Sequence, residues 1–263
     1  MEVKNNLKLI FVYFMLNLKK EWQYKASFFM QKIIIIFNDL FSLIQWVVIF
    51  SIVDNIGGYG FREVLLLWSI AAGGYGIAHT FFAGAWNIKN LVYEGKLDVF
   101  LTQPKNLLIN VCCSNTDLSA IGDILYAFVV LMIIGAPWYW FLLLLPVIIL
   151  AGLLFVAMYV TYCSLCFYIK RGEALADTME GAMGKAANYP SVIFSQGVKI
   201  LMFTLLPVFF YTFIPAQYIF LNFNIWWVLL LIAVVTLWIL LAFFCFNRGV
   251  RRYNSGSLMG GRV

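Results

Sequence analysis

The chain has 263 residues, of which 63% are hydrophobic and only 11% are charged, and its formal net charge is +6. This composition leaves too little polar surface to cover a water-soluble globule of this size, so it indicates an integral membrane protein. The excess of basic residues is then explained by membrane topology and attraction to anionic lipid, which disfavours a nucleic-acid partner.

The first 31 residues predict a helix that lies on the membrane surface. Ile10, Phe11, Phe14 and Leu18 recur at helical spacing, with lysines off that face. This pattern is typical of an amphipathic helix in the cytoplasmic headgroup plane. An irregular basic leader that only sets topology is the alternative.

Six apolar runs follow, and each is close to the length of about 20 residues that a helix needs to cross a membrane. Because the runs are continuous rather than alternating, they indicate a helical bundle. The sequence therefore predicts an all-α integral membrane protein with one domain over 1–263. The predicted spans are 33–53, 64–86, 118–135, 139–169, 191–214 and 225–246.

The distribution of Lys and Arg predicts the orientation of these spans. Basic residues gather in the N-terminal segment, in the second and fourth loops and in the C-terminal tail. Arg62 is the only Lys or Arg in the loops on the opposite side. Since Lys and Arg are retained on the cytoplasmic side, we expect both termini there.

The second loop, NIKNLVYEGKLDVFLTQPKN at 87–106, is amphipathic and charged although it lies between two apolar spans. Its apolar residues form two helical stripes that are out of phase across Gly95, which predicts an elbow there. Pro104 predicts a second point at which a helix ends. An ordinary solvated loop is the alternative to a partner-binding role. Three charged residues between the two stops should stay solvated and be free to bind a partner: Glu94, Lys96 and Asp98.

Three charged residues fall inside predicted spans: Asp39, Asp123 and Lys199. Each lies roughly 10 Å from the cytoplasmic end of its span at 1.5 Å per residue, so the three are expected at one level. A lone charge in hydrocarbon is costly, and we therefore expect Lys199 to pair with Asp39 or Asp123. The pair would line or brace an inward-facing cavity. The alternatives are a purely structural pin, or side chains that reach the headgroups.

The stretch 207–224 makes the last apolar region longer than two spans require. Pro207 and Pro215 interrupt the helix while Phe210, Tyr211 and Phe213 keep it apolar, which predicts a broken or re-entrant segment near the outer leaflet. An aromatic belt that contacts only lipid is the alternative.

The sequence offers no catalytic or metal-binding constellation. Cys163 and Cys166 would share a helix face, but no His or acidic residue accompanies them, so we interpret them as apolar filler. There is no phosphate-binding loop of the GxxxxGK[ST] type. We therefore expect no cofactor in this chain, and any use of ATP would require another chain.

A family resemblance connects these features. YEGKLDVFLTQP resembles the EG-x-L-(D/E)-x-x-L-x-x-P signature between the second and third spans of ABC-2-type permeases, the membrane subunits of type V ATP-binding-cassette exporters. YPSVIFSQGVKILMFTLLPVFFYTFIPAQYI, from Tyr189, and FNRGVRRYNSGS, from Phe246, resemble later segments of a six-span branch of that superfamily.

The resemblance implies two permease subunits, identical or paralogous, bound to two cytoplasmic ATPase subunits that hold ATP and Mg. It implies that the 87–106 loop is a coupling helix, and that 207–224 is an outer gate suited to a lipid-like or amphipathic cargo. The expected location is a bacterial or archaeal cytoplasmic membrane. The positions that match the signature are Glu94, Gly95, Leu97, Asp98, Leu101 and Pro104.

Two further hypotheses concern the fourth loop and the driving force. Leu175, Met179 and Met183 would line one side of a short helix in that loop, which offers a second ATPase contact. The alternative function is a stand-alone ion-coupled secondary transporter, with the three intramembrane charges as coupling groups.

Overall fold

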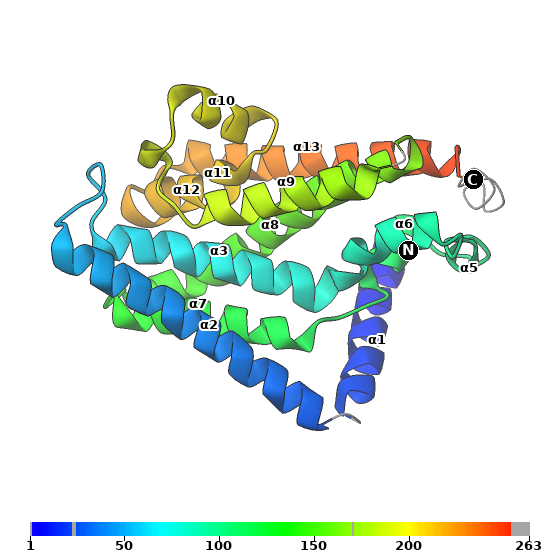
Figure 1. Ribbon diagram of the computed structural model, residues 1–263, viewed down its shortest axis with the longest axis horizontal. Helices are drawn as coiled ribbons and strands as arrows, with labels where there is room; N and C mark the ends of the chain where they lie inside the picture. The colour runs from blue at the N-terminus through cyan, green and yellow to red at the C-terminus, as the bar shows by residue number, and fades with distance from the viewer. Residues whose placement is uncertain (1, 23–24, 170, 254–263) are drawn as a thin grey trace.

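The computed structural model describes residues 2–22, 25–169 and 171–253, and in these residues every regular element is a helix apart from one bridge between Ile56 and Tyr59. The long helices run along the length of a bundle, with α2 tilted across it (Figure 1). The prediction of an all-α fold is confirmed. The long helices are α2 Lys25–Ile52, α3 Phe61–Phe82, α7 Ile121–Ile133, α8 Trp138–Cys163 and α13 Ile225–Val250.

Three helical stretches in the described residues are long and apolar enough to cross a membrane: Phe61–Tyr93, Trp138–Phe167 and Ile225–Val250. A fourth candidate is the pair Leu107–Cys113 and Leu118–Ile133, which is bent by 73°. Predicted spans two, four and six overlap the first three stretches, and span three overlaps the second helix of the bent pair. The first predicted span, 33–53, lies in α2 apart from its last residue. Six spans remain a prediction.

Helix α1, Glu2–Trp22, lies at one end of the bundle near α6 and is steeply inclined to the long helices (Figure 1). The Tyr13 hydroxyl donates a hydrogen bond of 2.7 Å to Asn110 Oδ1 of α6, Leu107–Cys113. Phe14 packs with its ring centroid 5.4 Å from that of Phe81, whereas Phe11 is 62% exposed. The helix is confirmed, and its place in the headgroup plane stays a prediction.

The centre of the bundle is the close crossing of α3 and α8. A Cβ atom added to Gly74 would lie 2.9 Å from Ala151 Cβ, and one added to Gly152 would lie 2.8 Å from the Gly74 carbonyl oxygen. Small residues therefore let the two backbones approach, as membrane helices commonly do. The buried side chains of Leu66, Leu67 and other apolar residues complete this core.

The predicted fifth span, 191–214, is not one helix. The chain there forms short pieces separated by Pro207 and Thr212, since a proline ring cannot continue the preceding helical hydrogen bonds. Val208 and Phe209 between these breaks are fully buried. The pieces are α10 Gln196–Thr204, α11 Val208–Tyr211, α12 Phe213–Pro215 and the π-helix η5 Ala216–Leu221, followed by Asn224, which caps α13.

Between α8 and these pieces in the chain lies α9, Gly172–Ala187, which packs one face along α8 and leaves the other face exposed (Figure 1). The short helix predicted after Gly172 is confirmed, and its role as an ATPase contact stays a prediction. Met183 on α9 is fully buried, Leu175 and Met179 are partly buried, and Glu173 and Asp177 are exposed.

Candidate functional site

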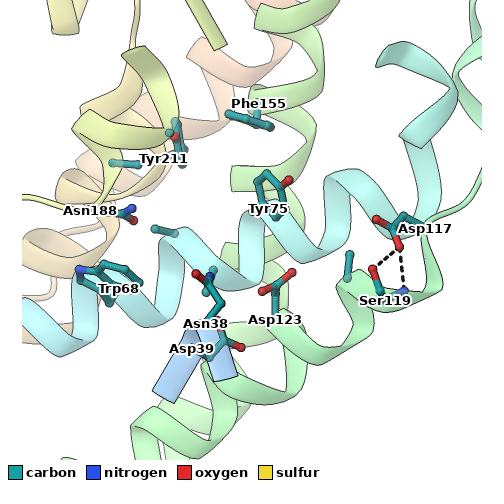
Figure 2. Close-up of a pocket in the computed structure, with 15 residues that line it drawn as sticks. Asn38, Asp39, Trp68, Tyr75, Asp117, Ser119, Asp123, Phe155, Asn188 and Tyr211 are labelled. Carbon is teal, nitrogen blue, oxygen red and sulfur yellow. Dashed lines mark hydrogen bonds between the residues drawn. The ribbon is translucent and has the colours of Figure 1, made fainter. Parts of the chain in front are cut away.

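A cavity of about 380 Å³ lies among α2, α3, α7, α8, α9 and α11. Asp39 from α2 and Asp123 from α7 both line it, with Asp117 at the start of the short helix η2, Leu118–Ala120 (Figure 2). The structure thus brings together two of the three intramembrane charges that the sequence singled out.

Asp39 is the most enclosed of these carboxylates. Its side chain is only 8% exposed, and among the described residues it has no hydrogen bond and no ion pair. An unpaired charge in a membrane interior costs about 3 kcal/mol even on the lenient insertion scale. A proton on Asp39 or a cation in the cavity would relieve this cost.

Lys199 does not meet these carboxylates. It lies on α10, is partly exposed, does not line the cavity, and forms no ion pair with a described residue. The depth expected for Lys199 assumed one continuous fifth span, whereas the chain turns at Pro190 and starts α10 only at Gln196. The expected pairing is absent from this arrangement for that reason.

The predicted gate region reaches the same cavity through Tyr211. This side chain lines the cavity, packs its ring 5.8 Å from that of Phe155, and donates a hydrogen bond of 3.3 Å to the Met183 carbonyl of α9. Phe210 and Phe213 lie outside it and pack against Phe203 and Phe209 respectively. Pro207 and Pro215 are buried at the helix breaks.

The 87–106 segment begins as α4, Ile88–Tyr93, and turns at Gly95 with φ +72°. The Lys96 N–H donates to the Leu91 carbonyl across 2.9 Å, an i to i−5 bond that ends a helix at a left-handed residue. The predicted elbow at Gly95 is therefore confirmed. A single helical turn, α5 Asp98–Leu101, follows and ends before Pro104.

The tip of this segment is exposed and carries both charged and apolar side chains. Glu94, Lys96 and Asp98 are exposed, and Glu94 pairs with Lys96 at 2.6 Å. Leu97 is fully buried and anchors the turn, whereas Leu101 is 45% exposed. The tip therefore offers charged and apolar groups to a partner while one leucine fixes it to the bundle.

Two polar contacts join this segment to α9. Lys89 Nζ lies 2.5 Å from Asp177 Oδ1, and Trp86 Nε1 donates a hydrogen bond of 2.6 Å to Glu180 Oε1. Burial raises the pKa of Glu180, and the Trp86 hydrogen bond partly offsets that rise. The far end of α9 lines the cavity with Gly184, Ala187 and Asn188.

This connection was not predicted, because the contacting residues belong to two loops that are far apart in the sequence. The pattern that could have revealed it is a pair of matching spacings, since Trp86 and Lys89 are three residues apart, as are Asp177 and Glu180. Residues three apart share a helix face, so two such pairs can meet side by side.

A row of aromatic rings from α3 to α8 connects the cavity with Trp86. His79 stacks between Tyr75 and Trp86, with ring centroids 4.0 Å and 3.9 Å away, and Trp86 stacks 4.7 Å from Tyr159. Tyr75 lines the cavity. A continuous stack thus runs from the cavity wall to the residue that binds Glu180.

The family model described as "ABC-2 family transporter protein" matches residues 36–257 of the chain. Comparison with curated proteins and with solved structures gave no match. The matched region runs from α2 past the end of α13 and contains both the cavity and the 87–106 segment. This chain therefore belongs to the ABC-2 family of transporter proteins and is a multi-pass membrane protein.

Proposed function

We propose that this chain is the permease subunit of an ATP-driven exporter, in which two permease subunits, identical or paralogous, associate with two cytoplasmic ATPase subunits. ATP and Mg bind to the ATPase, where hydrolysis takes place. The chain itself carries cargo outward across the cytoplasmic membrane of a bacterium or archaeon by alternating access. The cargo is amphipathic or lipid-like.

The observation that carries this proposal is the connection between an exposed tip and a buried cavity. A transporter driven by a separate motor needs a surface that the motor can hold and a rigid element that reaches the cargo. The tip around Glu94 and Asp98 offers the surface. The Lys89–Asp177 and Trp86–Glu180 contacts join it to α9, which ends at the cavity.

The position of the tip in the bundle agrees with a cytoplasmic motor. The start of α1, the end of α13 and α5 lie at the same end of the molecule, and α10 lies at the other (Figure 1). In the proposed orientation the first end is cytoplasmic, and the broken stretch from Pro207 to Pro215 forms the outer gate.

Movement of the motor would reach the gate through α9. Tyr211 is bound to the Met183 carbonyl, so a shift of α9 also moves one wall of the cavity and the first helical piece after Pro207. In the mechanism that we propose, closure of the two ATPase subunits displaces the tip, tilts α9 and opens the cavity outward.

Affinity purification in mild detergent, followed by mass spectrometry, tests the proposal. We expect a stoichiometric ATPase with the wild-type chain and its loss from the E94K/D98K variant. D54K is the matched control, because Asp54 is an exposed carboxylate in the loop between α2 and α3, far along the chain from the tip. Recovery of this chain without any ATPase in several detergents would overturn the proposal.

A further inference from the structure

The lining of the cavity combines two kinds of side chain. Asp39, Asp117 and Asp123 are acidic, and no described lining residue is Lys or Arg. The lining also contains the aromatic residues Trp68, Tyr75, Phe155 and Tyr211. The volume of about 380 Å³ falls in the range of cavities that hold small organic molecules.

Asp39 is the carboxylate of this cavity whose negative charge has no compensating group among the described residues. Asp39 is more than nine-tenths buried, points into the cavity, and has no partner among the described residues (Figure 2). Asp117 is held by the N–H of Ser119 at 2.8 Å and also accepts a hydrogen bond from the Ser119 hydroxyl. Asp117 and Asp123 add two further carboxylates to the lining of the same cavity.

The aromatic side determines what kind of cation fits. Metal cations such as Ca²⁺ and Mg²⁺ prefer to be surrounded by oxygen ligands, and much of this wall is carbon. Faces of Trp and Tyr attract organic cations through the ring quadrupole and also cover apolar surface. Figure 2 shows the Asp39 and Asp123 carboxylates on one side of the cavity and Tyr75 and Trp68 along α3.

We propose that this cavity binds the cargo, and that the cargo is a monovalent organic cation with an aromatic or apolar body. Asp39 is the counter-ion, and Trp68 and Tyr75 hold the body. The inference rests on the proposed function in taking the cavity as the cargo site, and it narrows the cargo from amphipathic compounds in general to cationic ones.

Binding of tetraphenylphosphonium to the full-length chain in lipid nanodiscs tests this inference. We expect D39N to weaken binding at least about tenfold, which corresponds to 1.4 kcal/mol, and D39E to retain binding. D54N is the matched control, since Asp54 is exposed and outside the cavity. Neutral triphenylphosphine oxide should bind more weakly and be indifferent to D39N.

A second variant keeps the test decisive if D39N does not fold. W68L should weaken binding of the cation about tenfold, whereas W226L should leave it unchanged because Trp226 is 74% exposed on α13. Equal effects of W68L and W226L, or equal binding of the charged and neutral probes, would overturn the inference.

The outcomes also separate this inference from the proposed function. An ATPase that co-purifies with a chain that does not bind the cation leaves the function intact and removes the inference. Cation binding by a chain that never associates with an ATPase, and whose transport collapses with the proton gradient, supports the cargo class and refutes the ATP-driven mechanism. Competition by Na⁺ with no response to the organic cation would identify Asp39 as a coupling-ion site and overturn the inference.

Discussion

The cavity and the tip of the 87–106 segment contain the same kinds of acidic residue in opposite surroundings. Asp39 is 8% exposed and unpaired among the described residues, whereas Glu94 is exposed and pairs with Lys96. Exposed ion pairs contribute roughly 0–1 kcal/mol because water screens them, while buried charges are costly unless compensated. Loss of the tip charges should therefore cost little stability, whereas a cation or a proton should stabilise Asp39.

The two regions are also built differently. The cavity walls depend on close packing between helices, as at Gly74 and Gly152, whereas the tip depends on a local backbone conformation at Gly95. Packing involves many atoms from distant parts of the chain, and a turn involves only a few neighbouring residues. Substitutions at these glycines should therefore differ in size.

The largest effect is expected from G152V. The new side chain would meet the Gly74 carbonyl oxygen and Ile77, both 2.8 Å from the position of its Cβ atom. Backbone atoms cannot move aside as a flexible side chain does. We therefore expect the free energy of unfolding to fall by about 3 kcal/mol or more, or the variant not to fold. Denaturant unfolding of the variant in detergent measures this loss of stability.

G181V is the control for that variant. Gly181 lies on α9, and nothing is within 4 Å of an added Cβ atom. A change of less than about 1 kcal/mol is expected there, from helix propensity alone. If G181V and G152V cost the same, close packing at the α3–α8 crossing is not what supports the cavity.

The next effect concerns the connection between the two regions. K89E places like charges at Lys89 and Asp177, and under the proposed mechanism transport should fall about tenfold, within the usual 1–3 kcal/mol of coupling between sites. The pair is partly exposed, so stability should change by less than about 1 kcal/mol. Transport in proteoliposomes with the ATPase present measures the effect.

The reciprocal variant K89E/D177K should recover most of the transport, and both variants should still bind the ATPase. Loss of ATPase binding by K89E alone would mean that Lys89 belongs to the docking surface rather than to the connection. No recovery in the double variant would argue against a role for the pair itself.

A smaller effect is expected from G95A at the tip. Gly95 has φ +72°, where a residue with a Cβ atom costs about 1–2 kcal/mol. Because G95A disturbs the shape of the turn, the affinity of the chain for the ATPase should fall. G181A is the matched control, because Gly181 is helical and open and should gain about 0.5–1 kcal/mol. A neutral result for G95A would mean that the tip readily adopts another turn.

The smallest effect is a dependence of stability on pH through Glu180. Burial raises its pKa above the ordinary value of 4.5, so the folded state binds the proton more tightly than the unfolded state. The resulting stabilisation is present below that ordinary value and is lost as the pH rises through the raised pKa. Thermal unfolding between acidic and neutral pH should show this decline, and E180Q should reduce it.

W86F sharpens the same measurement. The Trp86 hydrogen bond stabilises the carboxylate, so its removal should raise the pKa of Glu180 further and extend the decline in stability to higher pH. If the profile of W86F matches that of the wild type, the hydrogen bond does not control the charge of Glu180.

Much of the fold could be predicted from the sequence because hydrophobic run length and turn chemistry are local properties. The spans near α3, α8 and α13 follow from continuous apolar runs, and the elbow at Gly95 follows from a break in helical phase. The prediction of a single helix for the fifth span was wrong, because the length of an apolar run does not show where Pro190 and Pro207 turn the chain.

The site was predicted only in parts. Asp39 and Asp123 stand out as charges in apolar runs, and Tyr211 as an aromatic residue between two prolines. No local pattern shows that all three line one cavity, or that Lys199 does not. The position of a residue along a span determines its depth in the membrane. The direction in which its side chain points depends on how the helix is rotated against its neighbours.

Three properties can be predicted from the sequence alone: a helical membrane protein, a charged turn at Gly95, and acidic residues within the apolar segments. These properties depend on the composition and spacing of neighbouring residues. Three features depend on the folded arrangement: which carboxylates share a cavity, the packing of one face of α9 along α8, and the contacts of Lys89 and Trp86 with Asp177 and Glu180. The reason is physical: contacts between residues about 90 positions apart in the chain depend on the close packing of α3, α8 and α9, which no single segment encodes.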